Sequence, residues 1–331
     1  MKATSFNTGW TCRHLGSSAP GTPVTLPHDA MLAEERSQTS AGGTNTGWFA
    51  GYDYLYEKHF TPDAAQAAQC AVLEFEGVYH NAEVHLNGEK IASCPYGYSD
   101  FYADLTGKLL PGRDNVLEVI AHNADQPNSR WYSGAGIYRP VTLWTAPARH
   151  ILPDGVQVRT LSIDPAEVEV TVQTTASGAV AVAILDGEQT VATAQAESNG
   201  KAVLQVQIPN AKLWSPDSPA LYRCRAMFGD DCAETTFGVR TLSWGDDGFL
   251  LNGKRVILLG ACVHHDHGVL GACCYPEAEE RKVRLLQKVG YNAVRCAHNP
   301  CSKAFLDACD RLGMLVMDEY ADMWYIHKTP I

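Results

Sequence analysis

Two kinds of hydrophobic spacing divide this chain, and the change from one to the other restricts the folds that it can adopt. Up to about residue 243, short runs alternate between apolar and polar residues and are separated by turn residues, as in half-buried β-strands. Beyond residue 243, continuous apolar runs alternate with segments in which apolar residues recur at helical spacing. Strands joined through helices pair in parallel, so the sequence predicts all-β domains followed by an α/β domain.

The composition is that of a folded protein. Of the 331 residues, 45% are hydrophobic and 19% are charged, which supplies enough apolar material for more than one core. The formal net charge of −11 repels phosphate backbones and anionic lipids, so we expect no nucleic-acid partner and no membrane partner. No apolar run reaches the length of a signal-peptide core or of a membrane span, which predicts a cytoplasmic protein. The cysteine count of 11 is odd, and we interpret the thiols as reduced.

Residues 1–150 are expected to form a two-sheet jelly roll. Short strand-like runs follow one another without helical spacing, and Asn87-Gly88 is a strong signal for a tight β-hairpin turn. Aromatic residues gather in the loops 47–52 and 130–138. Stacking on sugar rings explains these aromatics, and packing between the sheets explains them equally well.

Residues 151–243 continue the alternating pattern with fewer aromatics. Asp186-Gly187 predicts another hairpin, and strands at this spacing over about 90 residues indicate an immunoglobulin-like β-sandwich. No residue in this segment suggests chemistry, so we predict a spacer domain.

Residues 244–331 follow the order β-α-β-α-β. The expected elements are a strand buried on both faces at 256–260, a helix at 276–290, a strand at 292–295, a helix at 302–312 and a strand at 314–317. Pro276 in its first turn and Gly290 at its end mark the first helix, whose apolar face would carry Val283, Leu286 and Val289. This order indicates the beginning of a barrel or of an open doubly wound sheet.

Polar residues stand at the carboxyl end of each of the three predicted strands. They are, in chain order, His264, Asp266, Arg295, His298, Asp318 and Glu319. In parallel α/β folds the carboxyl ends of the strands converge on the active site. The sequence therefore predicts a functional site at this edge of the sheet.

Two other kinds of site are open at this stage. The candidate ligands for a metal are Cys262, His264, His265, Asp266 and His267. A structural zinc site needs well-spaced Cys and His pairs, however, and a cluster of His and Asp can equally hydrogen-bond a polyol. Cys296 as a nucleophile would need a base and an electropositive pocket.

The segment from Asn292 to Met317 resembles the first signature of glycoside hydrolase family 2, the family of β-galactosidases, β-glucuronidases and β-mannosidases. The matching residues are Asn292-Ala-Val-Arg295-Cys-Ala-His298-Asn-Pro300, Phe305-Leu306, Asp310 and Gly313-Met-Leu-Val-Met317, with Asn299 where Tyr is commonest. Four more segments are similar to family landmarks in the expected order, namely 134–141, 237–240, 251–254 and 260–267. The resemblance extends over the whole chain.

This resemblance implies a jelly-roll sugar-binding domain, an immunoglobulin-like domain and the first three βα units of a TIM barrel. It implies an O-glycosyl hydrolase that removes terminal β-linked sugars with retention, for which two carboxyl groups about 5–5.5 Å apart are needed. In the family both are glutamates, and one follows an Asn at the end of the fourth barrel strand. The chain contains no Asn-Glu dipeptide and ends just beyond the third predicted strand. We therefore expect an incomplete barrel, assign no catalytic residue, and expect no glycosidase activity from this chain alone.

The resemblance also implies which residues line the sugar pocket. The matching positions are His264, Asp266, Arg295, His298, Asp318 and Glu319 in the barrel and Arg130 and Trp131 in the first domain. The histidines and Asp266 would hydrogen-bond sugar hydroxyls, Arg295 would hold the nucleophile ionised, and one of the last two acidic residues would close the pocket floor. Core packing is the alternative role for Trp131. The choice between His264 and its neighbours His265 and His267 is left open.

The segment 318–328 most resembles β-galactosidase-like members, so we expect a terminal β-galactoside as substrate, with a β-glucuronide as the alternative. The chemistry requires no cofactor, and Mg²⁺ or Na⁺ in the full-length parent would bind at positions beyond Ile331. The expected partner is carbohydrate, and the parent is expected to be a homo-oligomer. A noncatalytic carbohydrate-binding protein, acting through the loops 47–52 and 130–138, is the rival interpretation.

Overall fold

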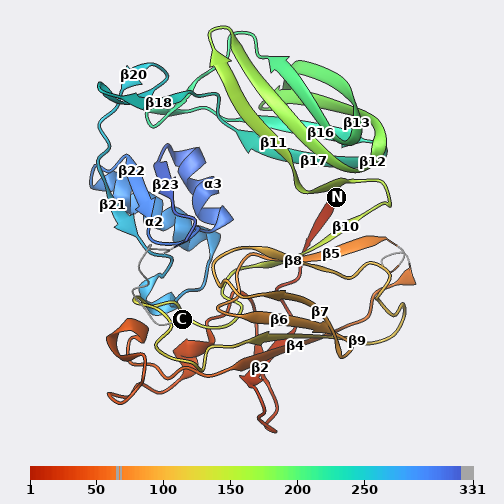
Figure 1. The fold of residues 1–331 in the computed structure, drawn as a ribbon, viewed down its shortest axis with the longest axis vertical. Helices are drawn as coiled ribbons and strands as arrows, with labels where there is room; N and C mark the ends of the chain where they lie inside the picture. Colours follow the sequence, from red (N-terminus) through yellow and green to blue (C-terminus); the bar gives the residue numbers. More distant parts are fainter. Residues whose placement is uncertain (65–66, 68, 322–331) are drawn as a thin grey trace.

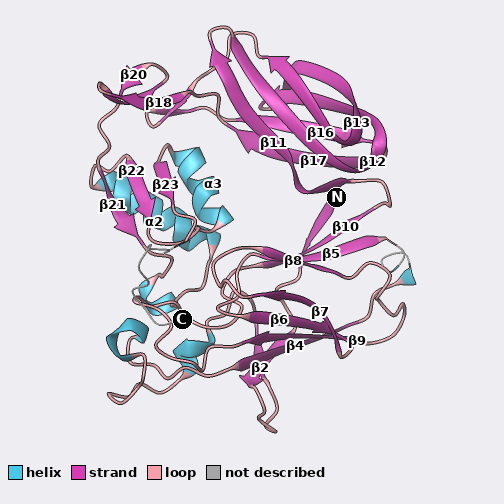
Figure 2. Cartoon of the chain, in the orientation of Figure 1, coloured by secondary structure: helices cyan, strands magenta, loops and turns pink. Residues whose placement is uncertain are grey.

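The computed structural model describes residues 1–64, 67 and 69–321, which form two β-domains and an α/β unit. The α/β unit, blue in Figure 1, lies beside the space between the β-domain at the bottom of the view and the β-domain at the top. Figure 2 shows that the two β-domains consist almost entirely of strands and loops, and that the longer helices belong to the α/β unit. No helix among the described residues is both long and apolar enough to span a bilayer.

The first domain is a sandwich of two antiparallel sheets. One sheet has the order β1 (Lys2–Ser5), β10 (Val141–Ala146), β5 (Cys70–Phe75) and β8 (Phe101–Asp104). The other has the order β3 (Thr22–Val24), β2 (Trp10–His14), β4 (Tyr54–Phe60), β9 (Asn115–Ala121), β6 (Ala82–Leu86) and β7 (Glu89–Cys94). Short 3₁₀ turns occupy Ala30–Ala33 and Gly43–Thr46. The predicted jelly-roll sandwich is confirmed.

Local sequence explains this sandwich well. Strand β9 buries Leu117, Val119 and Ala121 on one face, as its two-residue period predicts. The predicted hairpin joins β6 to β7, and both Asn87 (φ +52°) and Gly88 (φ +84°) have the positive φ that such a turn needs.

The second domain is built from long antiparallel strands. They are β11 (Ile151–Ile163), β12 (Ala166–Asp186), β13 (Gln189–Gln207), β16 (Tyr222–Phe228) and β17 (Asp231–Phe237). The β12–β13 hairpin turns at Gly187, which has φ +61°, as the sequence predicts. Strand β12 curves around the core and buries alternate valines at its start, Val168, Val170 and Val172. The immunoglobulin-like domain is therefore also confirmed.

Small antiparallel pairings connect this domain to the α/β unit. They are β14 (Trp214–Ser215) with β15 (Ser218–Pro219), and β18 (Leu242–Gly245) with β19 (Gly248–Leu251) and β20 (Lys254–Arg255). The fully buried Trp214 packs against Leu251 and Leu315 and donates a hydrogen bond from Nε1 to the Asp310 carbonyl (2.8 Å). This indole therefore joins the second domain to the α/β unit.

The α/β unit contains three parallel strands in the order β21 (Gly260–Val263), β22 (Ala293–Cys296) and β23 (Leu315–Asp318). Its helices α2 (Pro276–Lys288) and α3 (Lys303–Leu312) cover one face of the sheet, and a 3₁₀ turn lies at Gly268–Leu270. Ser302 caps α3, since its Oγ accepts a hydrogen bond from the Phe305 amide (3.1 Å). The predicted order β-α-β-α-β is confirmed as the start of a TIM barrel, with three strands and two helices among the described residues.

Two details of the sequence prediction are wrong. The apolar run 256–259 is not a buried strand, because Ile257 and Leu259 are 68% and 54% exposed and strand pairing starts only at Gly260. β21 is an edge strand among the described residues, so nothing there covers the outer side of this run. Val289 is 68% exposed because α2 ends at Lys288, so Val289 lies outside its buried face.

A buried carboxylate joins the first domain to the α/β unit. Asp29, which is 2% exposed, accepts hydrogen bonds from the amides of Met31 (3.1 Å), Ala135 (3.0 Å) and Ala272 (2.9 Å). The Tyr132 hydroxyl donates a fourth hydrogen bond (2.7 Å). Three separate chain segments are therefore tied to one side chain.

Two glycines make this approach possible. Gly134 (φ +70°) and Gly271 (φ +59°) have left-handed backbones, and a Cβ added to them would lie 2.7 and 2.3 Å from Asp29 Oδ2. Any larger residue would displace the carboxylate from its donors.

A second polar contact lies where α3 meets the other two domains. Lys303 Nζ bonds to Glu74 of the first domain, which is 3% exposed, and to Asp154 of the second (3.1 Å). Asp100 lies 3.5 Å away. One ammonium group therefore neutralises carboxylates from both β-domains.

We predict that Asp29→Ala lowers the free energy of unfolding by about 3 kcal/mol, because it leaves three buried amides without their acceptor. Urea unfolding followed by tryptophan fluorescence would measure the loss. Asp230→Ala, at an exposed turn, is the matched control and should change stability by less than about 0.5 kcal/mol. Equal effects of the two substitutions would contradict the role given to Asp29.

Candidate functional site

The parallel strands bring their polar carboxyl ends to one edge of the sheet. His264 follows β21, His298 follows β22 and Glu319 follows β23. Because the three strands run in the same direction, these side chains share one end of the unit, as the sequence predicts.

A charged network lies at the centre of this edge. Arg295 Nε donates a hydrogen bond to Glu319 Oε1, while Glu319 Oε2 lies 3.0 Å from His298 Nδ1. Arg295 Nη2 also lies 3.4 Å from that ring nitrogen, and Nη1 lies 3.4 Å from Cys262 Sγ. The hydrogen bond to Glu319 is the largest cause of a raised Arg295 pKa, so the guanidinium stays charged.

Trp131 reaches this network from the first domain. Its ring stacks on His264, with centroids 5.3 Å apart and planes inclined by 26°, and lies 5.4 Å from the His298 ring. Trp131 Nε1 donates to the Tyr98 hydroxyl (3.1 Å), and the Arg130 guanidinium lies 5.6 Å from the indole. The half-buried indole therefore forms a wall of the candidate site.

The three histidines after β21 have different surroundings. His264 lies against Trp131, and burial lowers its pKa. His265 is 8% exposed, its Nε2 donates to the Ser133 carbonyl (3.2 Å), and burial lowers its pKa to about 4. His267 Nε2 lies 3.4 Å from Glu279 Oε1, under the site. Of the three, only His264 therefore faces the network.

The two acidic residues of the third strand separate, because neighbouring strand residues point to opposite faces. Glu319 joins Arg295, whereas Asp318 Oδ1 accepts a hydrogen bond from the Cys301 amide (3.1 Å) on the helix side. Asp318 therefore lies away from the network that includes Glu319.

Asp266 is half-buried beside the network. Its charge acts on His264, where it opposes the larger effect of burial on the histidine pKa. The structure thus brings together His264, Arg295, His298, Glu319, Arg130 and Trp131, with Asp266 at the margin and Asp318 outside.

Metal ligands do not converge on the histidine-rich loop. Among the described residues, sets of three metal-type ligand atoms within 4.8 Å of one another occur only at Cys296, Cys301 and Asp318 and at Glu74, Asp100 and Asp154. The second set already holds the Lys303 ammonium. A metal-dependent hydrolase built on residues 262–267 is therefore not supported.

The parallel strands, together with part of α3, border a large hollow of about 960 Å³. Trp244 and Met317, which are 81% and 59% exposed, lie along it, and Arg295 lies at its polar end. The candidate site therefore opens onto an apolar surface of the α/β unit.

Sequence reasoning missed three supporting residues. Arg139, 3% exposed, donates to the Tyr98 carbonyl (2.9 Å) and to the Pro300 carbonyl (2.8 Å), which positions the loop that carries His298. Tyr98 supports Trp131, and Glu279 supports the base of the site. The aromatic cluster 95–98 was a usable signal for Tyr98, whereas Glu279 looks like an ordinary first-turn acid of a surface helix.

Comparison with known proteins agrees with this architecture. Residues 10–149 match the family model described as glycosyl hydrolase 2 galactose-binding domain-like, 154–240 match glycosyl hydrolases family 2, and 243–325 match the TIM barrel domain of that family. Three domain models of one hydrolase class therefore match the two β-domains and the α/β unit in turn. The chain belongs to glycoside hydrolase family 2.

Individual relatives give the same result. The chain is 38% identical to the β-galactosidase BoGH2A of Bacteroides ovatus, over 98% of this chain and 42% of that protein. It is 32% identical to a putative β-glucuronidase of Formosa agariphila, over 93% and 31%. A crystal structure of a family 2 member from Bacteroides cellulosilyticus superposes with a TM-score of 0.91 and 34% identity, over 99% and 47%. The chain spans less than half the length of each of these relatives.

Glu279 provides a pH test of the support beneath the site. It is 2% exposed, and although burial alone would raise its pKa, His267, Lys282 and the Ser302 hydroxyl together lower it to about 2. A lowered acid pKa adds stability that is present above the unfolded value and is lost as the pH falls toward the folded value. We predict that Glu279→Gln lowers the free energy of unfolding by about 3 kcal/mol at pH 7, and that this difference narrows between pH 4.5 and 2.

Urea unfolding at a series of pH values would measure this difference. Glu277→Gln, on the exposed face of the same helical turn, is the control and should show no such pH dependence. A constant difference between Glu279→Gln and the unmodified chain from pH 7 to pH 2 would contradict the prediction.

Proposed function

We propose that residues 1–331 are the N-terminal part of a retaining exo-β-glycosidase that hydrolyses terminal β-linked sugars, with β-galactosides as its substrates. The observation that carries this proposal is the contact between Trp131 of the jelly-roll domain and His264 and His298 at the barrel strand ends. A sugar needs an apolar surface for its ring face and polar groups for its hydroxyls, and this contact places both together. Family membership supports the same class of reaction.

The residues of the site have distinct proposed roles. The Trp131 indole offers a stacking surface, while His264 and His298 offer ring nitrogens to sugar hydroxyls. Glu319 accepts a hydrogen bond from Arg295 and lies beside His298, so its carboxylate positions both side chains at the edge of the site.

The described strands do not supply the reaction's carboxyl pair. Retaining hydrolysis needs two carboxyl groups about 5–5.5 Å apart on either side of the bond that breaks. Glu319 is engaged by Arg295, and Asp318 lies on the other face of the sheet. The proposal therefore includes that this chain alone binds sugar without cleaving it.

The charges of the site favour a neutral sugar over an anionic one. The Arg295 guanidinium is already paired with Glu319, and the Asp266 carboxylate lies close by. A glucuronide carboxylate would meet these two negative groups beside the Arg295 and Arg130 guanidiniums, a set with no net positive charge to attract it, whereas a galactoside brings no charge. The relatives include both a β-galactosidase and a putative β-glucuronidase, so the family alone does not choose between them. The segment 318–328 resembles β-galactosidase-like members, and its residues 322–328 lie outside the described part of the chain.

Ligand-observed NMR tests the proposal directly. We predict that methyl β-galactoside binds to the 331-residue chain more tightly than methyl β-glucuronide, and that Trp131→Ala weakens the binding about tenfold or more, a loss of about 1.4 kcal/mol. Met227→Ala, which removes an exposed apolar side chain of the second domain, is the control and should leave binding unchanged.

Three outcomes would contradict parts of this proposal. Binding that survives Trp131→Ala would place the sugar elsewhere, and stronger binding of the glucuronide would identify the alternative substrate. Turnover of an aryl β-galactoside that co-purifies with the chain would show that these residues are sufficient for catalysis.

A further inference from the structure

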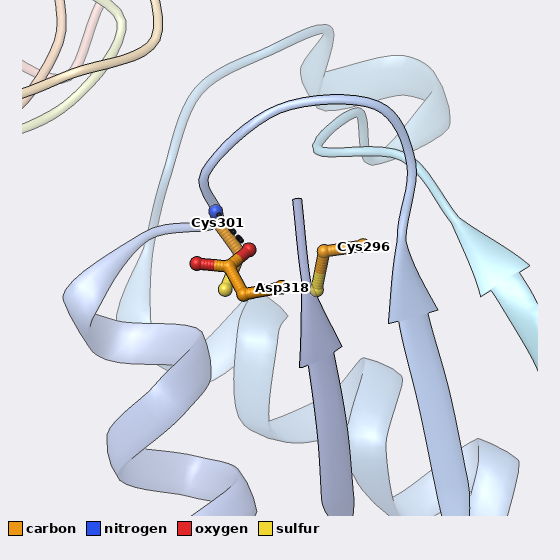
Figure 3. Close-up of side chains that lie close together, drawn as sticks. All are labelled: Cys296, Cys301 and Asp318. Atoms are coloured by element: carbon orange, nitrogen blue, oxygen red, sulfur yellow. Dashed lines mark hydrogen bonds between the residues drawn. The ribbon is translucent and has the colours of Figure 1, made fainter. Parts of the chain in front are cut away.

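Two thiols and a carboxylate converge behind the candidate site, on the helix side of the sheet (Figure 3). Cys296 ends β22 and is 3% exposed, Asp318 ends β23, and Cys301 lies just before the first turn of α3. Their ligand atoms all lie within 4.8 Å of one another. No role in the proposed sugar pocket uses this group.

We propose that Cys296, Cys301 and Asp318 form a binding site for one Zn²⁺ ion. Thiolates and carboxylates are established zinc ligands, with Zn–S near 2.3 Å and Zn–O near 2.0–2.2 Å. Tetrahedral ligands at these distances lie roughly 3.4–3.8 Å from each other, which the observed cluster can reach with small side-chain movements. Water completes the fourth position.

Metal binding exchanges two thiol protons for one Zn²⁺ ion. The S–H bonds of the two thiols break, two protons pass to the buffer, and two Zn–S bonds form. No oxidant or reductant takes part.

The charges around the cluster favour a cation. Among the residues that the structure describes, no lysine, arginine or histidine forms an ion pair with Asp318. The contrast with the Glu74, Asp100 and Asp154 set is informative, because Lys303 already neutralises those carboxylates. Asp318 has no such paired ammonium among the described residues, and the nearby Lys282 Nζ, which lines the same hollow as the two cysteines, is bonded to the His264 carbonyl (3.0 Å).

The ligands are also held in place before any metal binds. The Cys301 amide donates to Asp318 Oδ1 (3.1 Å), which orients the carboxylate and leaves Oδ2 for a metal. Arg139 holds the Pro300 carbonyl (2.8 Å), next to Cys301. Both cysteines line a hollow of about 20 Å³, enough for one water molecule beside them.

Zinc at this position would hold both ends of the loop 297–300, which connects the two thiols and carries His298. The metal would therefore act on the shape of the sugar-facing loop from behind and not on the reacting bond. This inference does not depend on the proposed substrate, because it concerns metal binding by the chain itself.

Titration of the fully reduced 331-residue chain with Co²⁺, followed by displacement with Zn²⁺, tests the site. We expect one Co²⁺ per chain with a thiolate-to-cobalt charge-transfer band, which Zn²⁺ abolishes. Cys301→Ser and Cys296→Ser should each eliminate this band. Asp318→Asn, a change at an exposed side chain that should not disturb folding, should weaken metal binding about tenfold or more.

Cys232→Ser is the matched control, since it removes an exposed thiol of the second domain. It should leave both the stoichiometry and the affinity unchanged. Failure of the reduced chain to bind Co²⁺ would overturn the proposal. Binding that is unchanged in both Cys301→Ser and Asp318→Asn would overturn it equally, and neither result would bear on sugar binding.

Discussion

The buried carboxylate of Asp29 is the contact on which the arrangement of this molecule most depends. It accepts hydrogen bonds from three backbone amides and one tyrosine hydroxyl, which come from segments up to 243 residues away. Satisfying a buried carboxylate this fully offsets much of the cost of removing it from water, and each donor is held in a defined position. Tyr132 is one of these donors and directly follows Trp131, so the same contact sets where the indole meets His264.

Other interdomain contacts are polar in the same way. Lys303 neutralises Glu74 and Asp154, and Arg139 holds the carbonyl of Pro300, so that charged side chains join all three folded units. Such contacts contribute more to a unique arrangement than to net stability, because desolvation offsets much of their attraction. For a site assembled from two domains, the relative position of those domains is what its chemistry requires. Apolar contacts between domains, such as those of Trp214 with Leu251 and Leu315, add attraction that is less directional.

Much of the fold was predictable because its causes are local. The two-residue period of β9 and the Asn87-Gly88 turn depend on neighbours in sequence, and each has its expected structure. The run 256–259 was mispredicted because its hydrophobicity indicates burial but does not say which partner provides it. The candidate site was predictable as a set, since the carboxyl ends of parallel strands coincide. The separation of Asp318 from Glu319 follows from the alternation of side chains along a strand. The hydrogen-bond partner of each residue does not follow from that alternation.

The sequence by itself determined the two β-domains, the alternation of parallel strands with helices and the edge at which polar residues meet. These properties follow from periodicity and from the direction of the chain. Only the tertiary structure decided that His264 faces Trp131 while His265 is buried against Ser133 and His267 lies beside Glu279. It likewise decided that Cys296 and Cys301 lie beside Asp318. Such choices depend on the packing of segments distant in sequence, which set the burial and the partners of each side chain, and no local pattern encodes them.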